Sequence, residues 1–132
     1  MPYDRTVRLP GTFDETVEAV RRALSDQGFG VLTEIDVQAT LRARLGHEME
    51  PYLILGACNP PLARQALDTD RSIGLLLPCN VVVRAEGEQV VVQAIDPSTM
   101  VTLTGDDAMA PVADEASRRL DAALAALAET GG

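Results

Sequence analysis

The sequence predicts an α+β fold, an antiparallel sheet of about five strands with three helices packed on one face. Stretches that alternate apolar and polar residues, or are apolar throughout, are typical of strands. Stretches with apolar residues at every third or fourth position are typical of amphipathic helices. The chain has 132 residues, 46% hydrophobic and 23% charged. These values predict a single globular domain, residues 1–132, with one hydrophobic core.

The first strand and the first helix are predicted from residues 3–28. Residues 3–9 alternate in the manner of a strand. Thr12 and Glu15 have the spacing of an N-terminal capping box, and Gly28 stands where a helix-ending glycine is expected. The apolar residues between these signals share one helical face: Phe13, Val17, Val20 and Leu24.

A second strand is predicted over residues 30–37, with two distinct sides. One side has Val31, Thr33, Ile35 and Val37, and the other has Leu32, Glu34 and Asp36. Residues 39–45 could prolong this strand or form one or two helical turns, and Gly46 ends the pattern. Residues 52–57 are apolar and predict a third strand.

The second half of the chain predicts a helix, a hairpin and a last helix. Asn59 and Pro60 are typical of an N-cap and a first helical position. Residues 73–84 and 89–96 predict two strands, joined as a hairpin by the turn around Gly87. A polar link over residues 96–111 then leads to a helix capped by Asp114. The apolar side of that helix has Leu120, Ala123, Leu124 and Leu127.

The predicted order is β-α-β-β-α-β-β-α, and one face of the sheet lacks a cover. Residues 52–57 and 73–83 are apolar at odd and even positions alike, which is typical of strands buried on both faces. The three helices suffice for only one face. We therefore expect a second copy of the chain to cover the other, which predicts a homodimer.

Composition excludes several classes of function. The net charge is −9, from 20 acidic and 11 basic residues, and every basic residue is Arg. A chain without Lys has no Schiff-base lysine and no phosphate-binding lysine of the Walker type. Its negative field argues against nucleic acid and anionic membranes as partners. Without a signal peptide or an apolar run of roughly 18 residues, we expect a cytoplasmic protein.

The two cysteines suggest a site. Cys58 precedes Asn59 at the predicted start of a helix, where the helix dipole favours a thiolate. Cys79 precedes Asn80 in a predicted strand that Pro78 interrupts, which indicates an edge, a bulge or a close approach by another group. The pair could be plain core, a reactive or ligand-binding site, or a structural disulfide. The predicted binding residues are Cys58, Asn59, Cys79 and Asn80.

Two acidic residues are added to these candidates. Glu34 and Asp36 lie two apart on one strand, so their carboxylates share a face and could bind a ligand or be ordinary exposed acids. His47 stands in a polar loop. No pair of candidate ligands has the close spacing of zinc motifs, so no metal site is predicted. Nucleotide-binding and hydrolase motifs are missing as well, and the catalytic residues and any cofactor stay unknown.

Two motifs, GACNP at 56–60 and LLPCNV at 76–81, carry a resemblance to a known family. With EIDVQATLRARLG before them, the chain resembles the domain of unknown function 302 family over about residues 3–127. The resemblance implies a TATA-binding-protein-like fold, usually homodimeric, with no established activity. Members often occur beside sulfur-transfer and redox proteins. Arg44 stands where many members have Lys, which keeps the charge but changes the donor geometry.

Three functions are compatible with these observations. The first is a homodimeric binding module for a small ligand or sulfur-containing group near the two cysteine motifs. The alternative is a thiol-dependent redox or sulfur-transfer enzyme. The third is an interaction domain whose motifs only build the dimer.

Overall fold

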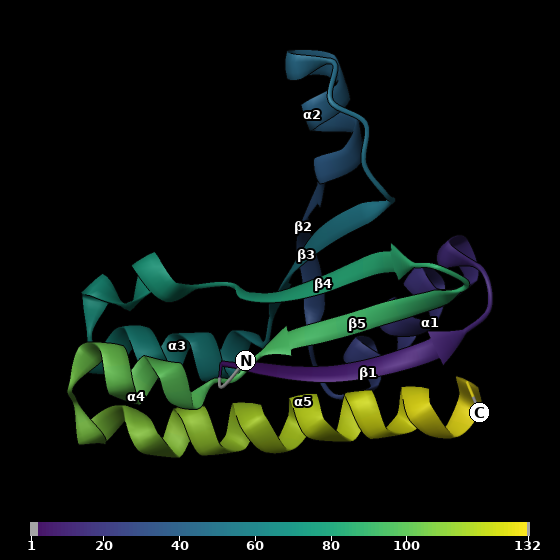
Figure 1. The fold of residues 1–132 in the computed structure, drawn as a ribbon. Helices are drawn as coiled ribbons and strands as arrows, with labels where there is room; N and C mark the ends of the chain where they lie inside the picture. The colour runs from purple at the N-terminus through teal and green to yellow at the C-terminus, as the bar shows by residue number, and fades with distance from the viewer. Residues whose placement is uncertain (1–2, 132) are drawn as a thin grey trace.

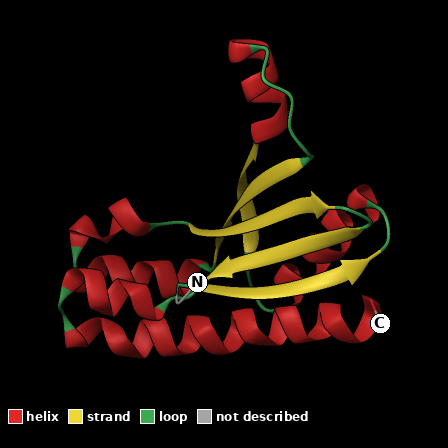
Figure 2. Ribbon diagram, in the orientation of Figure 1, coloured by secondary structure: helices red, strands yellow, loops and turns green. Residues whose placement is uncertain are grey.

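The computed structural model describes residues 3–131, and in this part of the chain an antiparallel five-stranded sheet is the central element (Figures 1 and 2). The strand order is β1-β5-β4-β3-β2, and each neighbouring pair is antiparallel. The strands are β1 (Asp4–Pro10), β2 (Gly30–Asp36), β3 (Tyr52–Cys58), β4 (Cys79–Glu86) and β5 (Gln89–Ile95). The predicted α+β class and the sheet are confirmed.

The number of helices differs from the prediction, because the described residues form five α-helices and two 3-10 helices. They are α1 (Phe13–Asp26), α2 (Val37–Leu45), α3 (Pro60–Thr69), η1 (Arg71–Leu76), α4 (Ser98–Thr104), η2 (Asp107–Met109) and α5 (Ala110–Gly131). Helix α2 forms in a segment for which the sequence was compatible with either a longer strand or one or two helical turns. α4 and η2 lie within the segment predicted to be a polar link. Among residues 3–131, no helix is long and apolar enough to cross a lipid bilayer.

Two predicted boundaries are wrong for local reasons. The side chain of Asp70 accepts a hydrogen bond from the Ser72 amide at 2.9 Å and starts η1, so residues 73–76 are helical rather than extended. Pro78 lacks an amide donor and precedes β4 instead of interrupting it. At the other end, α5 continues directly from η2, so that Asp114 lies inside the helix and does not cap it.

The two predicted sides of β2 are also wrong at Val31, because the strand contains a register shift. Val31 pairs with Ala57, whereas Thr33 pairs with Gly56, the next residue along β3. Neighbouring residues of a strand point to opposite faces, so Val31 and Thr33 do not share a side. Val31 packs against the main hydrophobic core.

The described residues form two hydrophobic clusters where one core was predicted. The larger lies between the sheet and helices α1 and α5, with Leu55, Val83 and Val92 fully buried. The smaller is built by α3, η1, α4, η2 and the first turns of α5, around Ile73 and Met109. Figure 1 shows α5 running beneath the sheet and on beneath α3 and α4, so this one helix belongs to both clusters.

The other face of the sheet is open in this chain. Helices α1 and α5 lie on one side of the sheet (Figure 2). The opposite side carries the half-buried side chains of Tyr52, Ile54 and Val82. Helix α2 stands away from the rest of the molecule at the end of β2 and β3, and none of its residues is buried (Figure 1).

Candidate functional site

Cys58 and Cys79 lie side by side at one end of the sheet. Cys79 pairs with Ala57, the residue before Cys58, and neighbouring strands are about 4.8 Å apart. A continuous pleat would direct Cys58 and Cys79 to opposite faces. However, β3 ends at Cys58 and β4 begins at Cys79, so both residues stand where the chain leaves the sheet. Both thiols are free and half-buried.

The two cysteines line a cavity of about 340 Å³, here called the cysteine cavity. Its other walls come from Phe29 and Leu32 around the start of β2, from α3 and η1, and from α4 and α5. Most of these side chains are apolar, among them Phe29, Leu62, Ala66, Leu77, Met100 and Val112. The cavity therefore joins the end of the sheet to the second hydrophobic cluster, and it suits an apolar molecule or group that also contacts sulfur.

Asn59 ties the cavity to the start of α3. Its side-chain oxygen accepts a hydrogen bond from the Leu62 amide at 3.3 Å, which confirms the predicted N-cap. Asn59 is also buried, with 7% of its surface exposed, and it lines the cavity. Because Cys58 directly precedes this cap, its side chain lies near the positive end of the α3 dipole.

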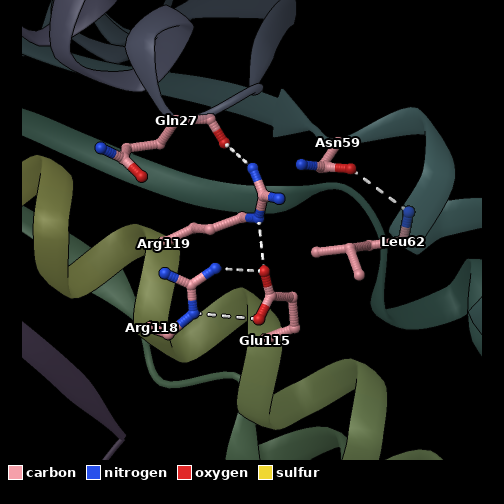
Figure 3. Close-up of polar contacts among 6 residues, drawn as sticks. All are labelled: Gln27, Asn59, Leu62, Glu115, Arg118 and Arg119. Carbon is pink, nitrogen blue, oxygen red and sulfur yellow. Dashed lines mark hydrogen bonds and ion pairs between the residues drawn. The ribbon is translucent and has the colours of Figure 1, made fainter.

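A cation from α5 lies close to the same point (Figure 3). Arg119 donates hydrogen bonds to the carbonyl of Gln27 at 3.0 Å and to Glu115 at 2.8 Å. A Cβ atom at Gly28 would lie 3.0 Å from the amide nitrogen of Asn59 and 3.2 Å from a guanidinium nitrogen of Arg119. The end of α1, the N-cap of α3 and this arginine are therefore packed together.

Arg119 shares Glu115 with a second arginine. Hydrogen bonds from Arg118 and then Arg119 lower the pKa of Glu115 to about 2. Glu115 consequently stays ionised at physiological pH and holds Arg119 in its bridging position. The Arg119 guanidinium adds positive charge near the start of α3, where an anion in the cysteine cavity would be stabilised.

The protonation of Cys79 limits the chemistry of the pair. Burial, and to a smaller extent the charge of Cys58, raises the pKa of Cys79 to about 11. Cys79 is therefore a neutral thiol at neutral pH, and it does not act as a nucleophile until a base or a metal removes its proton.

Gly56 allows the chain to pack closely next to the cysteines. A Cβ atom at Gly56 would lie 2.7 Å from Cγ of Pro78 and closer still to Oγ1 of Thr33. Glycine at this position lets Pro78, a cavity residue, approach the sheet directly before β4 begins. Pro78 in the sequence suggested that another group approaches the chain closely near Cys79. That group is β3 of the same chain.

The other predicted site residues lie elsewhere. Asn80 is exposed and lines a different cleft, of about 610 Å³, with Tyr3, Ile95 and residues of α4. The carboxylate of Glu34 forms an ion pair with Arg21 at 2.6 Å. Asp36 caps α2 by accepting a hydrogen bond from the Ala39 amide at 2.9 Å. The structure gathers Cys58, Asn59 and Cys79, but not Asn80, Glu34 or Asp36.

Sequence reasoning missed the residues that enclose the cavity from the far side. Met100 lies on α4, in a segment predicted to be a link, and Val112 and Ala116 lie on the part of α5 before or around its predicted start. The apolar pattern of α3 was visible in the sequence, but it could not show which side of α3 faces the cysteines. His47 lies exposed in the loop after α2.

Comparison with known proteins agrees with the resemblance seen in the motifs. The sequence model of the domain of unknown function DUF302 matches residues 5–127. A solved structure described as an uncharacterized conserved protein DUF302 from Bacillus stearothermophilus is 30% identical, with a TM-score of 0.87. The match covers 94% of this chain and 97% of that one. A search of curated proteins found no match.

Proposed function

The chain belongs to the DUF302 family, and on that premise we propose that it is a binding module whose cysteine cavity holds a small ligand or a sulfur-containing group. The observation that carries the proposal is the cavity itself. It brings two free thiols and the buried amide of Asn59 together within largely apolar walls. An apolar pocket with a few convergent polar groups is the usual form of a small-molecule site.

The polar groups would set the orientation of the ligand. The amide nitrogen of Asn59 is left free by the capping bond, which uses only its oxygen, and is a candidate donor to the ligand. The α3 dipole and Arg119 favour the negatively polarised end of a ligand on the Cys58 side. The apolar side chains of α3 and α5 would contact the remainder.

A thiol-dependent redox or sulfur-transfer enzyme is the second candidate. It is favoured by the adjacent positions of Cys58 and Cys79, which would allow one thiol to resolve a bond formed on the other. The raised pKa of Cys79 disfavours it as the attacking group, so Cys58 would have to act first. Rapid reaction of Cys58 with disulfide or persulfide donors would support the enzyme. Inert thiols with retained ligand binding would support the module.

We further propose that the module is a homodimer in the cytoplasm, where a reducing medium keeps both thiols free. The open sheet face bearing Tyr52, Ile54 and Val82, together with the unpacked helix α2, supports a second copy as the cover. A nine-residue helix with no buried residue is marginally stable in water, and contact with a partner would stabilise α2. An interaction domain whose motifs only build this dimer would have no ligand in the cavity.

Native mass spectrometry of the purified protein tests the binding module. Ala63 lines the cavity and is half-buried, so Ala63→Phe would place a phenyl ring in the space for the ligand. Gln65 is exposed on the same helix and outside the cavity, which makes Gln65→Phe a matched control. We expect bound ligand mass on the native chain and on Gln65→Phe, and none on Ala63→Phe. Ligand-free native protein, or equal ligand on both variants, would contradict the proposal.

A further inference from the structure

Three sulfur atoms line the cysteine cavity. Besides Cys58 at the end of β3 and Cys79 at the start of β4, Met100 of α4 faces the same space. Met100 is 5% exposed, so its thioether is enclosed with the two thiols in apolar surroundings. The three residues come from parts of the chain that are far apart in sequence, and the fold alone brings them to one cavity.

Two thiols and a thioether form a donor set of a particular kind. Soft thiolate and thioether sulfur selects Cu(I), whereas Mg²⁺ and Ca²⁺ require oxygen donors. Zn²⁺ takes four ligands, usually thiolate, imidazole or carboxylate. The cavity is lined by no imidazole or carboxylate, and residues 3–131 contain no cluster of three or more His, Cys, Asp and Glu. The donor set therefore fits a soft monovalent ion better than a divalent one.

We propose that the cysteine cavity binds one Cu(I) ion through Sγ of Cys58 and Sγ of Cys79, with Sδ of Met100 as a third donor. The inference rests on the proposed function, because both place a ligand in this cavity. On binding, two copper–thiolate bonds form, each thiol releases its proton to solvent, and copper keeps its oxidation state. The bound group then carries one negative charge.

The surroundings of the cavity suit that charge. Asn59, the N-cap of α3, directly follows Cys58, and Arg119 and Asn59 both lie next to Gly28. The start of α3 and Arg119 both stabilise an anion at the cavity wall. Each thiol releases its proton when its sulfur binds the ion as a thiolate.

Anaerobic titration with Cu(I) against a chromophoric Cu(I) chelator tests the proposal on the full chain. We expect one tight site per chain. Loss of an outer partner of a metal site costs roughly 10- to 100-fold in affinity. Cys58→Ser and Cys79→Ser each remove a direct ligand, so each should weaken Cu(I) binding by more than that. Met100→Leu removes one donor and should weaken binding at least tenfold, since even loss of an outer partner costs roughly 10- to 100-fold. Met109→Leu is the matched control, because Met109 is equally buried but lies outside the cavity, and it should bind as the native chain does.

The pH dependence gives an independent readout. Two protons leave as the two copper–thiolate bonds form, so the affinity at pH 8 should exceed that at pH 6. The rise should be smaller in Cys79→Ser, which has one thiol fewer to deprotonate. If a serine variant unfolds, the alanine variant at the same position takes its place.

Native-like affinity in either cysteine variant, or equal affinity in Met100→Leu and Met109→Leu, would overturn the copper site. The same result would leave the binding module intact if an organic ligand is still present on Gln65→Phe and lost from Ala63→Phe.

Discussion

Raising the pH from 8 to 11 should destabilise the protein through one residue, Cys79. Burial, and then the charge of Cys58, raises the pKa of the folded Cys79 thiol from the ordinary 9.0 to about 11. Between these values the unfolded chain loses the proton of Cys79 while the folded chain keeps it. The stability present below pH 9 is therefore lost progressively as the pH approaches 11. One pKa unit corresponds to about 1.4 kcal/mol, so the whole shift is worth about 3 kcal/mol. About 2 kcal/mol of this is lost from the free energy of unfolding by pH 11, where half of the folded thiol is still protonated.

Urea unfolding under reducing conditions at pH 8 and pH 11 measures this loss. The chain has no Lys, so few side chains change charge in this range. Cys79→Ala removes only the thiol of interest, and it should lose about 2 kcal/mol less than the native chain between the two pH values. Cys58→Ala should behave nearly as the native chain does, because burial is the larger cause of the shift.

Equal losses of stability in the native chain and in Cys79→Ala would refute this reasoning. The thiol would then be solvated in the folded protein, and the cysteine cavity would be more open than the structure indicates.

Four other predictions concern the fold and its partners. Gly56→Ala should lower the free energy of unfolding by about 1–3 kcal/mol, because its Cβ would lie 2.7 Å from Cγ of Pro78. Gly30→Ala should cost less, because a Cβ there contacts nothing within 4 Å. Equal losses in urea unfolding would contradict the close approach of Pro78 to Gly56. Asn59→Ala should lower stability by about 1 kcal/mol through loss of the α3 cap, and an unchanged urea midpoint would contradict that role. Sedimentation at micromolar concentration should show a dimer, and Val82→Asp on the open sheet face should yield a folded monomer; a native chain that sediments as a monomer would argue against the second copy. Mobility-shift assays at physiological salt should show no binding of DNA by a chain of net charge −9, and submicromolar affinity would contradict this expectation.

Local signals in the sequence predicted the elements that begin or end with specific residues. The Thr12 side chain accepts a hydrogen bond from the Glu15 amide at 3.2 Å, as the capping spacing indicated. Gly87 has a φ of 60° in the predicted hairpin turn. These contacts form between residues close in sequence, so their residue types are informative without knowledge of the rest of the fold.

The errors arose where distant contacts decide the local structure. Residues 73–76 are apolar enough for a strand, yet they form η1, where Ile73 packs into the second cluster. The polar composition of residues 98–104 concealed α4, because only Met100 and the partly buried Val101 of this helix pack into that cluster. Strand and helix compete closely in short apolar segments, and packing decides between them.

The candidate site divides in the same way. The sequence predicted Cys58, Asn59 and Cys79 together, since two neighbouring strands and a cap bring them to one place. It could not predict that Asn80 faces a different cleft, because the direction of a side chain at the first residues of a strand depends on where the strand begins. Glu34 was included as a ligand for its shared face with Asp36, but its carboxylate is paired with Arg21 of α1.

Thiol labelling tests most directly whether the two cysteines form a working site or are simply part of the core. Native protein, Cys58→Ser and Cys79→Ser are treated with iodoacetamide from pH 5 to pH 10, and the rate for each thiol is followed by mass spectrometry. We expect Cys58, at the start of α3, to react faster and at lower pH than Cys79, whose pKa is raised to about 11. Labelling of Cys58 no faster than a thiol of the unfolded chain, with Cys79 reacting equally, would show that the pair is only packed core.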